Sequence, residues 1–299
     1  MRIRPLGLLV MIYGAVLALA APSSGCTGTE DDPEAGAAES VVARHDGSKK
    51  PIKATVFQAA GPNAASIQST VDQFRVALGR VNNGNVPGPL STGRREINWD
   101  GGGSTATSLG PTPFDVFLNT RGSRSITPGT GFVQAPPTGL ADTFGNPTYA
   151  DIFQPFSPPR LFSPIGSNRT ETLFFVPGTA GGTPAATRGF GLILADVDLP
   201  NGTDHQKPSS KVEYFDVDGR LLFSSFAPAS PGDRGLTFFG IVLDDARIAR
   251  VLITAGNSEP GPNDTRRTDI VMMDDFIYGE PQAEPDICQT ALSAGSGSD

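Results

Sequence analysis

The sequence predicts a mainly β protein, an antiparallel β-sandwich with one N-terminal helix and long loops rich in proline and glycine. Three observations support this fold class. Gly and Pro are abundant, at 36 and 27 of 299 residues, whereas charged residues make up only 18%. Short runs of β-branched and aromatic residues, bounded by turn formers, fill most of the chain after residue 110. Only one segment shows a convincing helical period.

That segment is residues 64–78, which are expected to form a helix packed on the sheet. Its apolar residues recur at i, i+4, i+7 and i+11, which places them on one face of a helix. Asn63 is a suitable N-cap and Gly79 a suitable stop. The apolar stripe consists of Ile67, Val71, Phe74 and Leu78.

The expected strands follow the helix, and one pair has a clear turn. Asp218-Gly219 separates two apolar runs, which is the strongest hairpin signal in the chain. The region 85–164 holds too many prolines for central strands and is expected to form ordered loops that carry aromatic residues. The strand-like runs are "PFDVFLNT", "GFVQA", "ETLFFVPG", "RGFGLILADVDLP", "KVEYFDVDGRLLFSSFAP", "LTFFGIVLDD", "ARIARVLITAG" and "DIVMMDDFIYG".

The first 25 residues predict an export signal. Arg2 and Arg4 precede an uncharged apolar run, Leu6 to Ala20, which is short for a membrane span. Cleavage after Ala20 is one outcome. In the other, the sequence Ser-Ser-Gly-Cys serves as a lipoprotein processing site, and Cys26 becomes a lipidated N-terminus that anchors the chain to a membrane. We expect the second outcome, although Ser23 stands where the lipoprotein pattern prefers an aliphatic residue.

The composition divides the rest of the chain into three parts. Residues 26–51 are small, polar and acidic, and are expected to form a disordered tether. Residues 52–281 can bury one core and are expected to form a single β-sandwich domain. Residues 282–299 are expected to be a disordered tail. The two cysteines, Cys26 and Cys288, lie outside the domain, so disulfides do not hold the fold.

The C-terminal third resembles a known type of secreted domain. The segments "GFGLILADVD", "VEYFDVDGRLLFSSF", "LTFFGIVLDDARIARVLITAG" and "MMDDFIYGEP" resemble the jelly-roll β-sandwiches of bacterial secreted proteins, including galactose-binding-like and carbohydrate-binding modules. The resemblance covers residues 188–280 and implies a jelly-roll fold and export. In related jelly rolls, a carboxylate of the closing strand often binds structural Ca²⁺ together with oxygens of an early loop.

The two adjacent acids in "DIVMMDDFIYG" are the main candidate site. Strict strand alternation places Asp274 with Met272 and Phe276, and Asp275 with Val271, Met273 and Ile277. Both faces are apolar, so the strand is expected to be central, with Asp275 as the inward carboxylate.

The early loop "REINWDGGG" supplies further oxygens for a metal ion. Asp275, Glu96 and Asp100 are therefore the candidate ligands of a structural Ca²⁺. The alternative is that these acids bond to backbone N–H groups or pair with Arg94 or Arg95. The acids at 196–198 and 216–219 are interpreted as turns, because neither stretch has the remaining positions of a twelve-residue calcium loop.

The composition argues against several functions. The formal net charge of −8 argues against a nucleic-acid partner. Only two histidines, His45 and His205, are present, and neither lies on an expected scaffold element, so we expect no enzyme. The sequence therefore predicts an exported binding or adhesion module for a cell-surface polymer such as a glycan, with Trp99 as a ligand-stacking residue. The alternatives are Trp99 in the core of a structural envelope or matrix protein, and a glycan hydrolase that uses two carboxylates.

Overall fold

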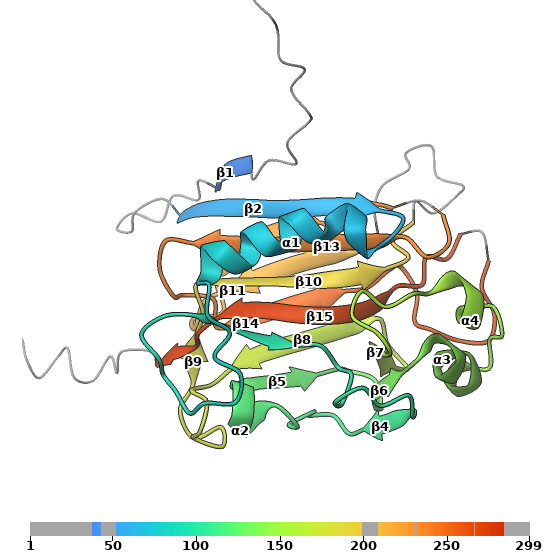
Figure 1. Cartoon of the computed structure of the whole chain (residues 1–299), viewed down its shortest axis with the longest axis horizontal. Helices are drawn as coiled ribbons and strands as arrows, with labels where there is room; N and C mark the ends of the chain where they lie inside the picture. The colour runs from blue at the N-terminus through green and yellow to red at the C-terminus, as the bar shows by residue number, and fades with distance from the viewer. Residues whose placement is uncertain (1–37, 43–51, 199–208, 231, 266, 284–299) are drawn as a thin grey trace, which may run out of the picture. The chain divides into compact units, whose positions relative to one another are not determined.

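The computed structural model describes residues 38–42, 52–198, 209–230, 232–265 and 267–283 (Figure 1). All of them belong to one compact unit, Ala35–Asp299. The expected signal segment 1–25, Cys26 and Cys288 lie outside the described residues. Among the described helices, none has the length and apolar character needed to cross a membrane.

A nine-stranded antiparallel sheet is the largest element (Figure 1). Its strands run in the order β1-β2-β13-β10-β15-β7-β6-β4, with β3 paired to β15. The strands are β1 (Ala38–Val42), β2 (Ile52–Gly61), β3 (Arg94–Ile97), β4 (Ser108–Gly110), β6 (Gly131–Ala135), β7 (Leu161–Ile165), β10 (Gly189–Ala195), β13 (Leu236–Leu243) and β15 (Met272–Gly279).

A five-stranded antiparallel sheet packs against the large sheet. Its order is β12-β11-β14-β8-β5. The predicted hairpin is present in it, because β11 and β12 pair and Gly219 adopts a φ of +76° in their turn. The strands are β5 (Ser123–Ile126), β8 (Arg169–Phe174), β11 (Lys211–Phe215), β12 (Leu221–Phe226) and β14 (Arg250–Thr254), while β9 (Ala185–Ala186) and β16 (Gln282–Ala283) form a separate short pair.

Aromatic side chains join the two sheets. The ring of Tyr214 in β11 lies 6.4 Å from that of Phe190 in β10, and its hydroxyl donates to the Phe190 carbonyl. Phe174 of β8 packs 5.2 Å from Tyr278 of β15. Burial of this apolar area is the main stabilising term of the fold. The predicted mainly β fold, with antiparallel sheets packed on each other, is confirmed.

Helix α1 (Ala64–Leu78) covers the other face of the large sheet, along β2 and β13 (Figure 1). Asn63 caps it by accepting from the Ser66 N–H at 3.1 Å. Phe74 is buried edge-on against Phe57 and Phe238, at 5.4 and 5.2 Å. The sheet accepts this ring because two facing residues are glycines: a Cβ at Gly191 or Gly240 would lie 2.9 or 3.0 Å from it.

Three more helices correct the expectation of a single helix, and strands β3 to β7 together with these helices correct the expectation of loops without central strands over 85–164. The helices are α2 (Leu118–Arg121), α3 (Pro137–Phe144) and α4 (Tyr149–Ile152). Helices α3 and α4 lie beside β6, and Leu140, Phe144 and Tyr149 join the same apolar cluster as α1. Strand β1 lies within the segment 26–51 and pairs with β2, and β16 lies at the start of the segment 282–299 and pairs with β9.

Strand β15 contains a β-bulge at the two adjacent acids. Leu192 pairs with Phe276 and Leu194 with Met273, so Asp274 and Asp275 together stand opposite Ile193. The extra residue resets the alternation, and the predicted face assignment is therefore wrong. Met273 and Phe276 face the five-stranded sheet, whereas Met272 and Ile277 face the helices. The strand is central and buried throughout, as expected.

Candidate functional site

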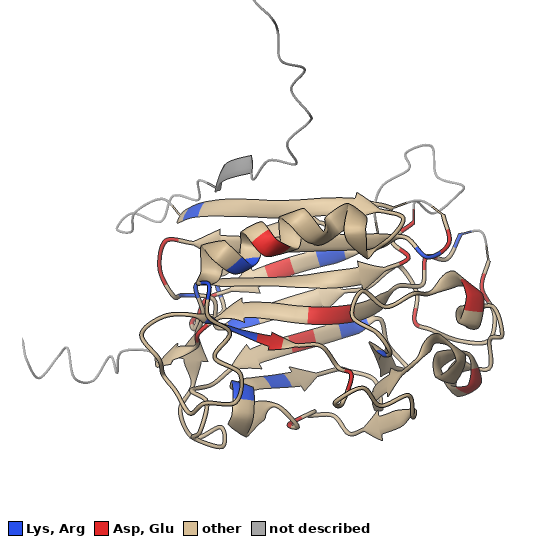
Figure 2. Ribbon diagram, in the orientation of Figure 1, with Lys and Arg blue, Asp and Glu red and all other residues tan. Residues whose placement is uncertain are grey.

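The bulge brings the carboxyl groups of Asp274 and Asp275 together, next to the loop that follows α4. Figure 2 shows this acidic segment on β15. Both acids are buried, not Asp275 alone, with exposed fractions of 0% for Asp274 and 3% for Asp275. Asp274 Oδ2 accepts from the Phe156 N–H at 2.6 Å and the Ser157 N–H at 3.3 Å. The Ser157 hydroxyl donates to Asp275 Oδ1 and lies 3.5 Å from Asp274 Oδ1.

Burial dominates the electrostatics of this pair. Loss of water raises the pKa of Asp274 well above its usual range, and the neighbouring charge of Asp275 raises it further. Burial also raises the pKa of Asp275 to about 6, while the Ser157 hydroxyl acts in the opposite direction. The pair therefore holds at least one proton more readily than exposed carboxyls do.

An arginine connects the pair to α1 and β3. Arg75 donates to Glu96 Oε2 at 2.9 Å, and its Nη2 lies 3.9 Å from Asp275 Oδ2. Glu96 also accepts from Arg94 Nε. Glu96 sits beside Asp275 because β3 pairs with β15 directly after the bulge, with Glu96 opposite Ile277. Glu96 is thus neutralised by two arginines.

The predicted calcium ligands are neighbours but do not form a metal-binding group. Asp100 accepts from the Arg160 N–H at 3.1 Å, and its charge contributes to the raised pKa of Asp274. Burial raises the pKa of Asp100. In the part of the chain that the structure describes, no set of three or more His, Cys, Asp and Glu side chains is arranged to hold a metal ion. The contacts correspond to the alternative interpretation, with backbone N–H donors and arginine partners.

Trp99 lies in the core, which corrects its expected role as a surface stacking residue. Its exposed fraction is 1% and its ring stacks on Phe162 at 3.7 Å. The chain turns inward at this position, where Trp99 adopts a φ of +61° and its indole N–H donates to the Asp274 carbonyl at 3.4 Å. Phe114, Phe117 and Phe276 surround the ring, so it presents no face to a ligand.

The five-stranded sheet has one face without a covering layer of described elements. Burial alternates along β5, β8, β11 and β14, so every second side chain is inside and the others are half-buried or exposed. In contrast, β10, β13 and β15 are buried at every position. We call this surface the open face; it consists of Arg124, Ile126, Arg169, Glu171, Leu173, Lys211, Glu213, Phe215, Arg250, Leu252 and Thr254.

Charged and apolar residues alternate in rows across the open face. One row runs Phe215, Arg250, Leu173 across three strands. The Arg250 guanidinium lies 3.9 Å from the centre of the Phe215 ring and donates to Glu171 at 2.6 Å. Lys211 donates to Glu213 at 2.8 Å. The side chains of these two ion pairs are 20% to 34% exposed, so the paired charges remain accessible to solvent.

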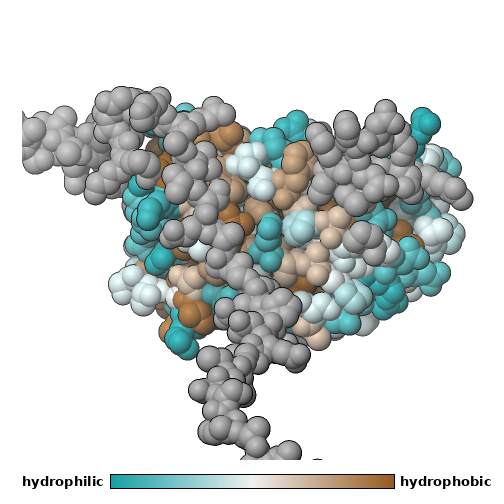
Figure 3. Space-filling view, turned by 90° about the horizontal axis from the view of Figure 1, so that it is seen from above, coloured by the Kyte–Doolittle hydropathy of each residue, from teal (hydrophilic) through white to brown (hydrophobic). Residues whose placement is uncertain are grey.

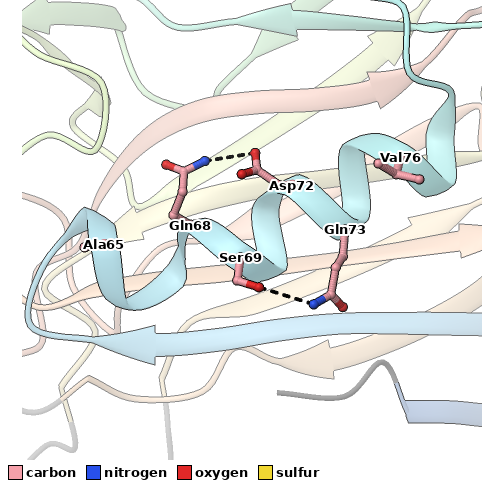
Figure 4. A pocket seen from close by; sticks show the side chains of 6 residues that line it. All are labelled: Ala65, Gln68, Ser69, Asp72, Gln73 and Val76. Carbon is pink, nitrogen blue, oxygen red and sulfur yellow. Dashed lines mark hydrogen bonds between the residues drawn. The ribbon is translucent and has the colours of Figure 1, made fainter. Parts of the chain in front are cut away.

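A second accessible region lies on the outer side of α1 (Figure 4). An open pocket of about 810 Å³ is lined there by Ala65, Gln68, Ser69, Asp72, Gln73 and Val76. Gln68 donates to Asp72 at 2.9 Å and Gln73 to Ser69 at 3.4 Å, so its polar groups bond to each other along the helix. Seen from above, polar and apolar residues are interspersed over the described surface (Figure 3). All of these described lining residues belong to α1, so the pocket is a shallow region on the surface of one helix.

Comparisons with known proteins identify no relative. No family model matches the chain, and neither a curated protein nor a solved structure matches it. The molecule is therefore defined by its coarse architecture, a mainly β protein of packed antiparallel sheets with a helix on the outer face of the larger one.

Proposed function

We propose that the protein is a non-catalytic binding module for neutral glycans and that the open face of the five-stranded sheet is the binding surface. The observation that carries the proposal is that the open face presents solvent-accessible side chains whose charges are paired, as in Arg250–Glu171 and Lys211–Glu213. A flat sheet surface suits an extended polymer, which lies along it, better than a small molecule, which needs a concave pocket.

The chemistry of the open face supports a sugar ligand. Half-buried apolar side chains such as Phe215 and Leu252 offer contacts to the C–H faces of sugar rings. The adjacent ion pairs, Arg250–Glu171 and Lys211–Glu213, hold donors and acceptors in fixed positions for hydroxyl groups. Because these charges are paired, the face favours a neutral polymer over a charged one.

The position of the buried pair Asp274 and Asp275 favours a binding module over a glycan hydrolase. A glycosidase needs two carboxyl groups that flank a bound sugar. Asp274 and Asp275 are buried and line neither the α1 pocket nor the one beside β2 and β13. The carboxylate of Asp274 accepts from the backbone N–H groups of Phe156 and Ser157, and that of Asp275 accepts from the Ser157 hydroxyl.

The proposal includes the jelly-roll relationship, export and lipidation of Cys26. An acidic tether after a lipid anchor would hold the domain away from the membrane while it binds a polymer of the cell surface. Mass spectrometry of the native N-terminus tests this step. A mature chain that begins at Ala21 with an unmodified Cys26 contradicts lipidation but not export.

The glycan proposal is tested with the mature chain carrying Cys26→Ser. Glycan arrays and sedimentation with insoluble polysaccharides identify a ligand, and variants then locate the surface. We expect Phe215→Ala and Arg250→Ala to weaken binding by about tenfold or more, the order of one lost stacking or charged hydrogen-bond contact. The matched control, Gln73→Ala on α1, should bind as the wild type does. Absence of any glycan binding, or loss of binding in the control alone, contradicts the proposal.

A further inference from the structure

Four acidic residues meet at the end of the large sheet where β10 ends and β15 begins. Asp196 and Asp198 follow β10, Asp233 precedes β13, and Asp269 precedes β15. Because β10 is antiparallel to both neighbours, its end lies beside their beginnings. The Asp196 N–H donates to the Gly235 carbonyl at 2.8 Å, and the Asp198 N–H donates to Asp269 Oδ1 at 3.1 Å.

Asp196 is buried in this cluster, and the described residues provide no counter-charge for it. Its exposed fraction is 7%, and Oδ1 has no hydrogen-bond partner among the described residues; the backbone N–H of Arg234 is the one donor that acts on this carboxyl group there. No Lys or Arg of the described chain forms an ion pair with any of the four acids. Burial raises the pKa of Asp196 to about 8, and the charges of Asp198, Asp269 and Asp233 add to this. A buried acceptor without a partner is expensive.

The backbone holds Asp196 in this position at a cost. Its φ is +69°, in the left-handed region that a non-glycine residue rarely adopts. Such a conformation is strained and clusters at functional sites.

The second buried acid, Asp269, is already oriented. Its carboxylate accepts from the Asp198 N–H and from the hydroxyl of Ser209, and burial raises its pKa to about 6. Asp198 accepts from the Gly232 N–H at 3.1 Å. The cluster therefore contains one carboxylate with an unpartnered Oδ1 atom, one oriented carboxylate and one carboxylate at the rim.

We propose that Asp196, Asp198 and Asp269 bind a divalent cation, with Ca²⁺ as the best fit. Ca²⁺ takes about six to eight oxygen ligands in flexible geometry and accepts water among them. The carboxylates are not gathered into a finished metal group in this structure. The half-buried Asp198 and the exposed Asp233 have the freedom to turn toward a cation, whereas Asp196 and Asp269 are held.

A pocket beside the cluster gives room for bound water. It has a volume of about 280 Å³ and is lined by residues that include Ser230, Gly232 and Asp233. Since water occupies about 30 Å³ in the liquid, several molecules fit there. A cation with three carboxylate contacts and water ligands would remove the mutual repulsion of the acids and give Asp196 Oδ1 a partner. This site is distinct from the carboxylate pair of β15.

The mature chain, freed of metal by a chelator and dialysed, tests the proposal at pH 8. Titration with CaCl₂ in a calorimeter should give saturable binding, and 1 mM Ca²⁺ should raise the melting temperature by several degrees if the Kd is about 10 μM. Asp196→Asn and Asp269→Asn should abolish both effects. The matched controls are Asp275→Asn, at the other buried acid pair, and Asp115→Asn, at an exposed ion pair, and both should keep them.

Each outcome decides the proposal. Absence of Ca²⁺ binding by the wild type, or Ca²⁺ binding that survives in Asp196→Asn, overturns it. Loss of binding in Asp275→Asn alone also overturns it, because the metal would then lie at the bulge. If Asp196→Asn fails to fold, Asp198→Asn at the half-buried rim replaces it, and Ca²⁺ affinity should fall about tenfold or more, the effect of one lost charged ligand.

Discussion

The hydroxyl group of Ser157 bonds to the carboxylate of Asp275, and this contact ties the loop after α4 to the bulge of β15. The loop residue also gives its N–H to Asp274, so one serine serves both acids. Without Ser157, the pair would rely on the N–H groups of Phe156 and Asp275 and on Arg75.

Ser157→Ala is therefore expected to destabilise the fold by about 1–3 kcal/mol, the cost of leaving a buried acceptor unsatisfied. The pKa of Asp275 should rise further, because the lost hydroxyl favoured its charged form. Urea unfolding measures the stability change. Ser69→Ala on the exposed side of α1 is the control and should change it by less than about 0.5 kcal/mol. Equal effects of the two substitutions would mean that the Ser157 contact contributes nothing.

The stability of the metal-free protein is expected to fall as the pH rises. Burial raises the pKa values of Asp275 and Asp269 to about 6 and that of Asp196 to about 8. The folded state thus holds these protons more tightly than the unfolded chain. Their stabilising effect is complete below the unfolded carboxyl pKa, near about 4, and is lost as the pH rises through 6 and 8.

Melting temperatures measured from pH 4 to pH 9 in chelator check this direction. Asp196→Asn should flatten the decline at its alkaline end, because the amide resembles the protonated acid and does not ionise. Asp275→Asn should flatten it around pH 6. A melting temperature that rises steadily over the same range would show that the buried acids are ionised in the folded state.

Phe74→Ala is expected to destabilise the protein by about 3–5 kcal/mol. The ring is fully buried between Phe57 and Phe238, above the two glycines that make room for it. Val76→Ala, on the same helix with an exposed fraction of 50%, is the control and should be close to neutral. Similar losses in the two variants would mean that helix propensity, not the core contact, controls stability.

The sequence predicted an element correctly where the hydrophobic period and the capping or turn residues pointed to the same structure. The 3.6-residue period of 64–78 and the Asp-Gly turn of 218–219 each predicted an element that the structure contains. The bulge was not predictable from alternation, because an inserted residue leaves both faces apolar and only the register of β10 against β15 reveals it.

The candidate sites were predicted less well, since they depend on distant contacts. The sequence placed Glu96 and Asp275 together, and β3 does bring them close, but Arg75 and Ser157 come from elements whose position no local pattern fixes. A lone Trp is compatible with either surface or core, and its four phenylalanine neighbours come from segments far apart in the chain. The open face did leave a signal, the alternation of charged and apolar residues in "KVEYF" and "RTETLF".

A buried ion pair fastens the 82–93 loop to the large sheet and gives the last prediction. Arg95 and Glu280 form two contacts of 2.6 Å, with side chains 0% and 2% exposed. Arg95 also donates to the carbonyls of Gly84 and Val86, and Glu280 accepts from Asn83. Removal of one partner leaves an unpaired buried charge, so Arg95→Met and Glu280→Leu should each cost about 3–5 kcal/mol.

The double variant Arg95→Met/Glu280→Leu should be less unstable than the sum of the single variants, because neither charge is then left alone. Urea unfolding of all four proteins gives the coupling free energy. Arg124→Met/Asp115→Leu provides a comparison at an exposed pair, where the expected coupling is about 0.2–1 kcal/mol. Additive losses at Arg95 and Glu280 would show that each residue acts through the loop carbonyls and Asn83 and not through the other.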